Sequence, residues 1–132
     1  MKEKKILIFE DEWATIRGSF DMANIYGFEG ALKFKIVPKS QDITFDNEWE
    51  NLYSCIFVDI TLAKNTQMDG FNIIKVIQDY KLFDLNKVVI LTGNAKIADK
   101  LKDMQINPIP SIIYKPLDFI ELTKILSNIL EN

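Results

Sequence analysis

Acidic residues end two of the short apolar runs in this sequence of 132 residues. Glu10 and Asp11 follow the first run, and Asp59 follows the third. Carboxylates that are brought together without a cation repel one another, and this repulsion raises their pKa values. A divalent ion removes the repulsion, and a set of oxygen ligands without His or Cys suits Mg²⁺. The pattern therefore predicts a Mg²⁺ site formed by Glu10, Asp11 and Asp59.

Thr92 and Lys115 end two further apolar runs and would add a hydroxyl and an ammonium group to the same site. Lysine pairs with phosphate as a point charge, and a threonine hydroxyl can donate a hydrogen bond to it. Phosphoryl transfer depends mainly on alignment and on neutralisation of charge. Because Asp59 would face both the metal and Lys115, we expect Asp59 to accept a phosphoryl group.

Each of these residues also has an ordinary structural interpretation. The run Glu10-Asp11-Glu12 could cap the helix that follows and stabilise its N-terminal dipole. Asp59 could be a turn residue, Thr92 a helix cap and Lys115 a solvated charge. Only their combination favours a functional site.

The composition excludes several other kinds of chemistry. Because the chain has no histidine, it cannot form a Ser-His-Asp or Cys-His catalytic group. The single cysteine, Cys55, cannot form an intramolecular disulfide or a structural zinc site. A net charge of −3 gives no general reason to bind nucleic acid or an anionic membrane. No apolar segment approaches the ~20 residues of a membrane span and no signal-peptide pattern is present, so we expect a cytoplasmic protein.

Short apolar runs alternate with helical patterns along the whole chain. Five strands are predicted, at residues 6–9, 32–36, 55–58, 88–91 and 112–114. Five helices are predicted, at residues 13–27, 45–52, 71–81, 97–104 and 119–129. Asp69 and Asp118 are suited to cap the third and fifth of these helices.

This alternation favours one α/β domain over residues 1–132, with a parallel sheet and helices on both faces. The first, third and fourth strands are apolar throughout, as strands that are covered on both faces are. The second strand alternates and the fifth is short, which suits the two edges of a sheet. The predicted architecture is therefore a flavodoxin-like doubly wound (βα)5 domain with a parallel five-stranded sheet in the order 2-1-3-4-5. In such a sheet, ligands bind beyond the carboxyl ends of the strands.

Five short motifs, taken in order, resemble the receiver domain of two-component response regulators of the chemotaxis-regulator type. They span essentially the whole chain: Ile6–Asp11, Phe57–Asp59, Met68–Gly70, Val89–Gly93 and Tyr114–Pro116. Each motif alone is weakly specific, but the ordered set is specific. The resemblance implies a signalling module that assists its own phosphorylation, and not an enzyme with a separate substrate.

The resemblance implies that Asp59 accepts its phosphoryl group from a phosphohistidine of a sensor histidine kinase or a phosphotransfer protein. Glu10, Asp11 and Asp59, together with the backbone carbonyl of Thr61, would bind Mg²⁺. The phosphoryl group would then switch a protein-binding surface formed by the fourth helix, the fifth strand and the fifth helix.

The resemblance also implies roles around the phosphoryl group. Thr92 would contact the group and move toward it, and Lys115 would pair with it. The Lys115–Pro116 bond would be cis. Asn94 and Thr61 occupy the two positions that modulate hydrolysis in this family, and the small residue Gly93 would leave room for the phosphoryl group.

Three features depart from the family's common pattern. The first acidic position is Glu10 instead of Asp, and its longer side chain could reach the metal through a water molecule. The loop Ile60–Met68 is a few residues longer than usual and lacks a common proline, which puts donor access and phosphoryl lifetime in question. The usual switch aromatic is replaced by Ile112, and Tyr114 is displaced along the strand, so we expect the aromatic half of the switch to be missing.

Two other functions fit less of the sequence. A pseudo-receiver would have the same fold without phosphorylation, and loss of Asp59 or Lys115 would indicate it, but both are present. A phosphohydrolase of the haloacid-dehalogenase type would need a second acid two residues after a nucleophile at the end of the first strand. Trp13 occupies that place after Asp11.

Overall fold

The computed structural model describes residues 1–62 and 64–131, and its five strands form one parallel sheet in the order β2-β1-β3-β4-β5. The strands are β1 (Lys4–Phe9), β2 (Leu32–Val37), β3 (Cys55–Asp59), β4 (Val88–Thr92) and β5 (Ser111–Tyr114). The helices are α1 (Trp13–Phe28), α2 (Trp49–Leu52), α3 (Gly70–Asp79), α4 (Ala98–Asp103) and α5 (Phe119–Leu130), with short 3₁₀ turns at Ser40–Asp42 and Leu85–Lys87.

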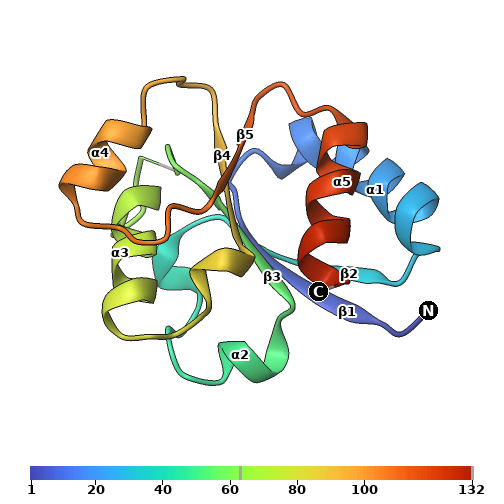
Figure 1. Ribbon diagram of the computed structural model, residues 1–132, viewed down its shortest axis with the longest axis horizontal. Coiled ribbons are helices and arrows are strands. Elements are labelled where there is room, and N and C mark those ends of the chain that lie inside the picture. Colours follow the sequence, from blue (N-terminus) through green and yellow to red (C-terminus); the bar gives the residue numbers. More distant parts are fainter. Residues whose placement is uncertain (63, 132) are drawn as a thin grey trace.

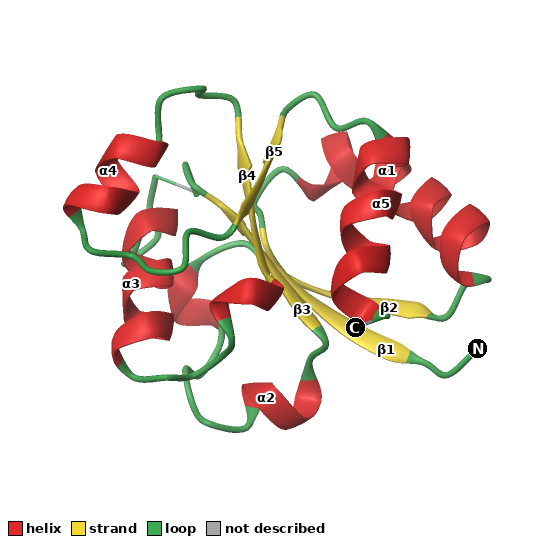
Figure 2. Cartoon of the chain, viewed as in Figure 1, coloured by secondary structure: helices red, strands yellow, loops and turns green. Residues whose placement is uncertain are grey.

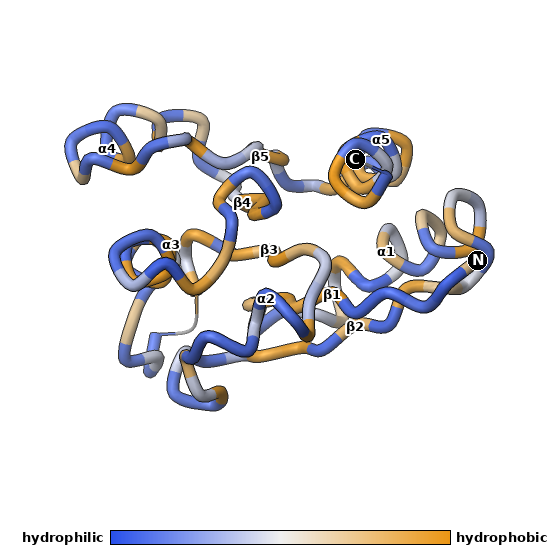
Figure 3. Tube along the Cα trace, turned by 60° about the horizontal axis from the view of Figure 1, so that its bottom comes forward, coloured by the Kyte–Doolittle hydropathy of each residue, from blue (hydrophilic) through white to orange (hydrophobic). Residues whose placement is uncertain are grey.

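Helices cover both faces of the sheet (Figure 1; Figure 2). Helices α1 and α5 lie side by side on one face, and α2, α3 and α4 lie on the other. Successive residues of β1 face opposite sides, so Ile6 and Ile8 join the core beneath α1 and α5 while Leu7 and Phe9 join the opposite core. Figure 3 shows the hydrophobic residues gathered along the central strands. The sheet is therefore the middle of three layers.

The predicted architecture is confirmed, including the strand order and the positions of β2 and β5 at the edges. Every residue of β3 and β4 is buried, in agreement with their apolar sequences. The predicted caps are also confirmed, because Asp69 Oδ1 accepts from the Asn72 N–H at 2.8 Å and Asp118 Oδ1 accepts from the Ile120 N–H at 2.9 Å. Among the described residues, no helix is long and apolar enough to cross a membrane.

The bounds of two helices differ from the prediction by two or more residues at one end, since α2 begins at Trp49 and α3 ends at Asp79. Helix α2 is a single turn, because Trp49 is its only buried residue and Leu52 faces solvent. Helix α3 stops at Asp79, so the prediction that Lys81 lies on this helix is wrong. Lys81 instead has a φ of 53°, and the Leu82 N–H donates to the Ile77 carbonyl, which closes the helix with a Schellman motif.

Backbone hydrogen bonds continue past the carboxyl ends of the strands and hold these ends together. The Glu10 N–H donates to the Val37 carbonyl at 3.1 Å, next to the end of β2. The Lys115 N–H donates to the Thr92 carbonyl at 2.8 Å, which joins the ends of β4 and β5. The parallel register thus brings the polar residues that end the strands to one edge of the sheet.

Candidate functional site

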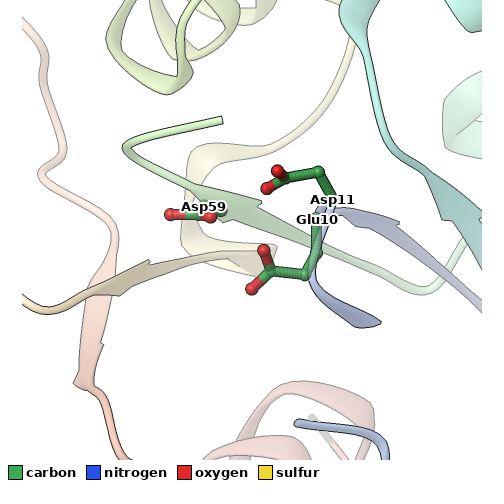
Figure 4. Close-up of side chains that lie close together, drawn as sticks. All are labelled: Glu10, Asp11 and Asp59. Carbon is green, nitrogen blue, oxygen red and sulfur yellow. The ribbon is translucent and has the colours of Figure 1, made fainter. Parts of the chain in front are cut away.

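Three carboxylates meet at the carboxyl edge of the sheet. Glu10, Asp11 and Asp59 each offer an oxygen, and these oxygens all lie within 4.8 Å of one another. Figure 4 shows the three side chains extending from the ends of β1 and β3 into one shared space. Glu10 and Asp59 are buried, at 0% and 3% exposure, and Asp11 is exposed. The three residues that were predicted to bind a metal therefore form one cluster that is open to solvent at Asp11.

Lys115 supplies the positive charge of this cluster. Its Nζ lies 2.6 Å from Glu10 Oε1 and 3.4 Å from Asp59 Oδ2. Burial alone would lower the pKa of Lys115, but the close contact with Glu10 and the charge of Asp59 outweigh this effect, so the pKa is raised. The Lys115–Pro116 bond is cis, which confirms the prediction. Lys115 thus contacts both Glu10, after β1, and Asp59, at the end of β3.

Glu10 is the most perturbed member of the cluster. The pKa of Glu10 is raised to about 7, first by burial and then by Asp59, while Lys115 opposes the shift. Its Oε2 accepts the Glu12 N–H at 3.2 Å, whereas its buried Oε1 has the ion pair with Lys115 and no hydrogen bond of good geometry among the described residues. A buried carboxylate beside a like charge fits a divalent cation with oxygen ligands.

Thr61 binds the carboxylate oxygen of Asp59 that Lys115 does not contact. Its N–H and its hydroxyl both reach Asp59 Oδ1, at 3.0 and 3.3 Å. The sequence pointed to Thr61 for its backbone carbonyl and as a modulating position, but spacing alone carried no sign of these two donors. Ala63, in the loop that was predicted to be unusually long, lies outside the described residues.

Gly70 lets the start of α3 approach the end of β3 closely. A Cβ atom at this position would lie 2.3 Å from the Asp59 carbonyl oxygen and 2.5 Å from the Ile60 Cα. The Gly70 N–H donates to the Ile60 carbonyl at 3.2 Å, which fixes this approach. Glycine is therefore required at the end of the motif Met68–Gly70, because any larger residue would collide with the backbone of Asp59.

Thr92 is fully buried at the end of β4. Its hydroxyl accepts the Asn94 N–H at 2.9 Å and lies 3.2 Å from the Asn94 carbonyl oxygen, so it closes a local turn. Helix α4 begins only at Ala98, so Thr92 does not cap it. A Cβ atom at Gly93 would have no atom within 4 Å, so this position is open. The predicted contact between Thr92 and a phosphoryl group stays a prediction.

The residues of β5 have different exposures. Ile112 is half-buried and packs on the core beside α3 and α4, whereas Ile113 is buried on the opposite face. Tyr114 is 47% exposed. An aliphatic side chain thus occupies the position where the family pattern would place the switch aromatic, and the role of Ile112 remains a prediction.

Addition of Mg²⁺ should change the fluorescence of Trp13. This residue begins α1, two residues after Asp11, and its ring packs against Phe20 and Phe34 at 5.1 and 5.7 Å. Titration of a Trp49→Phe variant isolates this signal, because the sequence has only two tryptophans. Asp11→Asn in the same background should abolish the change. An unchanged Trp13 spectrum across the titration would count against the metal site.

No protein-family model and no curated protein matches the sequence. Solved structures do match it. The receiver domain of the sensor histidine kinase PA1611 of Pseudomonas aeruginosa, which holds a magnesium ion in its active-site cleft, is 19% identical with a TM-score of 0.69 and covers 98% of this chain and 99% of its own. The chemotaxis protein CheY4 of Vibrio cholerae is 16% identical with a TM-score of 0.71, covering 97% and 99%. The receiver domain of NtrX from Brucella abortus is 17% identical with a TM-score of 0.65, covering 96% and 98%. The chain therefore has the fold of response regulator receiver domains.

Proposed function

We propose that residues 1–132 form a cytoplasmic receiver domain that is phosphorylated on Asp59 by a sensor histidine kinase or a phosphotransfer protein. The observation that carries this proposal is the position of Asp59. Its carboxylate is buried between Lys115 and the acidic residues at the end of β1, on the edge of the sheet where parallel α/β folds bind ligands. The receiver fold of the similar structures supports the same function.

In this proposal, Mg²⁺ is held by Glu10, Asp11, Asp59 and the backbone carbonyl of Thr61. When bound, the ion neutralises negative charge on the carboxylates and on the phosphoryl oxygens. The oxygen-only donor set and the raised pKa of Glu10 support this assignment. The PA1611 receiver domain, which coordinates a magnesium ion in its active-site cleft, provides a precedent in the same fold.

The remaining residues position the reacting groups. One oxygen of Asp59 attacks the phosphorus of a phosphohistidine, an O–P bond forms, and the P–N bond breaks with its electron pair retained by the departing imidazole. Lys115 already contacts Asp59 Oδ2, so it is placed to pair with the transferred group. The Thr61 donors hold the second oxygen and restrict rotation of the carboxylate. No histidine of this chain is needed, because the donor supplies the imidazole.

The output of the domain is proposed to be a change on the surface formed by α4, β5 and α5. Reorientation of Thr92 toward the phosphoryl group would break its hydrogen bonds to Asn94 and so alter the segment that leads to α4. The side chain that moves into the space left by Thr92 would be that of Ile112, which is aliphatic and not aromatic. A downstream protein that reads this surface is the proposed target.

Incubation with Mg²⁺ and acetyl phosphate, followed by intact-protein mass spectrometry, tests the proposal. The parent should gain one phosphoryl group, and Asp59→Asn should gain none. Asp21→Asn, which alters an exposed carboxylate in α1, serves as the matched control and should be modified like the parent. Absence of an adduct on the parent with any phosphodonor would instead indicate a pseudo-receiver. Steady turnover of a phosphate ester would indicate a hydrolase.

A further inference from the structure

The long loop after Asp59 is fastened to the segment that follows β2. The Ser40 N–H donates to Thr66 Oγ1 at 2.9 Å, and the Met68 N–H donates to Ser40 Oγ at 2.9 Å. Thr66 Oγ1 also lies 2.9 Å from the Met68 carbonyl oxygen and 3.1 Å from Ser40 Oγ. Ser40 is 2% exposed and Thr66 is half-buried, so these bonds are partly shielded from water. We call Ser40 and Thr66 the loop clamp.

A second, exposed pair of bonds extends the loop clamp. Gln41 Nε2 donates to the Asn65 carbonyl at 3.0 Å, and the Gln67 N–H donates to Gln41 Oε1 at 2.9 Å. The backbone on both sides of Thr66 is therefore held by residues of the 3₁₀ turn Ser40–Asp42. Apart from the local contact between Thr66 Oγ1 and the Met68 carbonyl oxygen, these bonds join segments that are distant in sequence.

The two fastened segments flank the acidic cluster. Val37, at the end of β2, accepts the Glu10 N–H, so the segment that contains Ser40 starts beside the first acidic residue. The other segment starts at Asp59 and carries Thr61, whose two donors hold Asp59 Oδ1. The loop clamp thus joins the Glu10 side of the site to the Asp59 side.

We propose that Ser40 and Thr66 are positioning residues that hold Thr61 in place over Asp59 and thereby set the Mg²⁺ affinity and the lifetime of the acyl phosphate. This inference rests on the proposed phosphorylation of Asp59. A longer loop can adopt more conformations. The hydrogen bonds of Ser40 and Thr66 restrict these conformations at the end of the loop that is far from Asp59. Without the loop clamp, Thr61 leaves Asp59 more often, and water reaches the phosphoryl group more easily.

Thr66→Val and Ser40→Ala remove the loop clamp, and Thr66→Ser keeps its hydroxyl. Asn24→Ala is the matched control, because the Asn24 side chain, in α1, makes two hydrogen bonds of 3.0 and 2.9 Å to the backbone of Leu32, the first residue of β2. We expect Thr66→Val and Ser40→Ala to shorten the half-life of the acyl phosphate and to weaken Mg²⁺ binding by about threefold to tenfold each, as expected from the loss of one or two hydrogen bonds. Thr66→Ser and Asn24→Ala should stay close to the parent in both measurements.

The result that would overturn the inference is a Thr66→Val protein whose half-life and Mg²⁺ affinity equal those of the parent while its melting temperature falls as in Asn24→Ala. In that case the loop clamp is only a stabilising contact. If the parent itself takes up no phosphoryl group, the proposed function fails, and the Mg²⁺ titration followed by Trp13 fluorescence then decides the inference alone. Weaker Mg²⁺ binding in Thr66→Val would support it, and unchanged binding would overturn it.

Discussion

Gly70→Ala should lower the free energy of unfolding by about 2–4 kcal/mol, because the new methyl group has no space. Its Cβ would lie 2.3 Å from the Asp59 carbonyl oxygen and 2.5 Å from the Ile60 Cα, and both are backbone atoms that cannot move as a side chain can. Either β3 or the start of α3 must shift. Since β3 carries Asp59, the same shift should weaken Mg²⁺ binding. Urea unfolding followed by circular dichroism measures the change in stability.

Gly18→Ala provides the matched control for this substitution. Gly18 lies in the exposed middle of α1, and a Cβ atom there would have no other atom within 4 Å. Alanine is a better helix former than glycine, so this variant should gain about 0.5–1 kcal/mol. Replacement of glycine by alanine should therefore lower the free energy of unfolding at position 70 and raise it at position 18. A Gly70→Ala protein as stable as the parent would show that α3 does not approach Asp59 as closely as described.

Glu10→Gln should stabilise the Mg²⁺-free protein at pH 7.5 by about 1–3 kcal/mol. The pKa of Glu10 is raised from an ordinary value of 4.5 to about 7, first by burial and then by Asp59. Between these two values the folded protein holds a proton that the unfolded chain releases, so the stability of the parent falls as the pH rises from 4.5 to 7. Glutamine does not ionise, and it removes one of the three negative charges of the cluster. The stability of the variant should therefore not fall between pH 4.5 and 7 as that of the parent does.

Thermal unfolding across pH 4.5 to 8 without Mg²⁺, compared with a Glu3→Gln control at an exposed position, measures this difference. Saturating Mg²⁺ should raise the stability of the parent more than that of Glu10→Gln, because the ion binds the ionised carboxylate. The difference in stability between the parent and Glu10→Gln should therefore be smaller when Mg²⁺ is present. A Glu10→Gln protein that is less stable than the parent at pH 7.5 would mean that the ion pair with Lys115 outweighs the burial of charge.

The fold and the gathering of the site residues could be predicted because they depend on short-range patterns. Apolar runs without polar interruption identified β3 and β4 as central strands, and the residues that end the strands had to share one edge of a parallel sheet. Asp59 and Lys115 were therefore placed together by topology alone.

The remaining features depend on contacts between side chains that spacing does not encode. The 2.6 Å ion pair between Lys115 and Glu10 depends on the conformations of two long side chains. The hold of Thr61 on Asp59 and the bonds between Ser40 and Thr66 depend on the path of a loop, for which no periodic pattern exists. The single turn of α2 reflects the exposure of Leu52, an apolar residue that the helical spacing predicts to be in the core.

The site of phosphorylation can be read directly by reducing the acetyl phosphate-treated protein with borohydride, which converts an aspartyl phosphate to homoserine, and then sequencing its peptides by mass spectrometry. We expect homoserine at position 59 alone, formed only when Mg²⁺ is present. Homoserine at Asp11, or reduction at neither position after treatment with acetyl phosphate and Mg²⁺, would contradict this expectation.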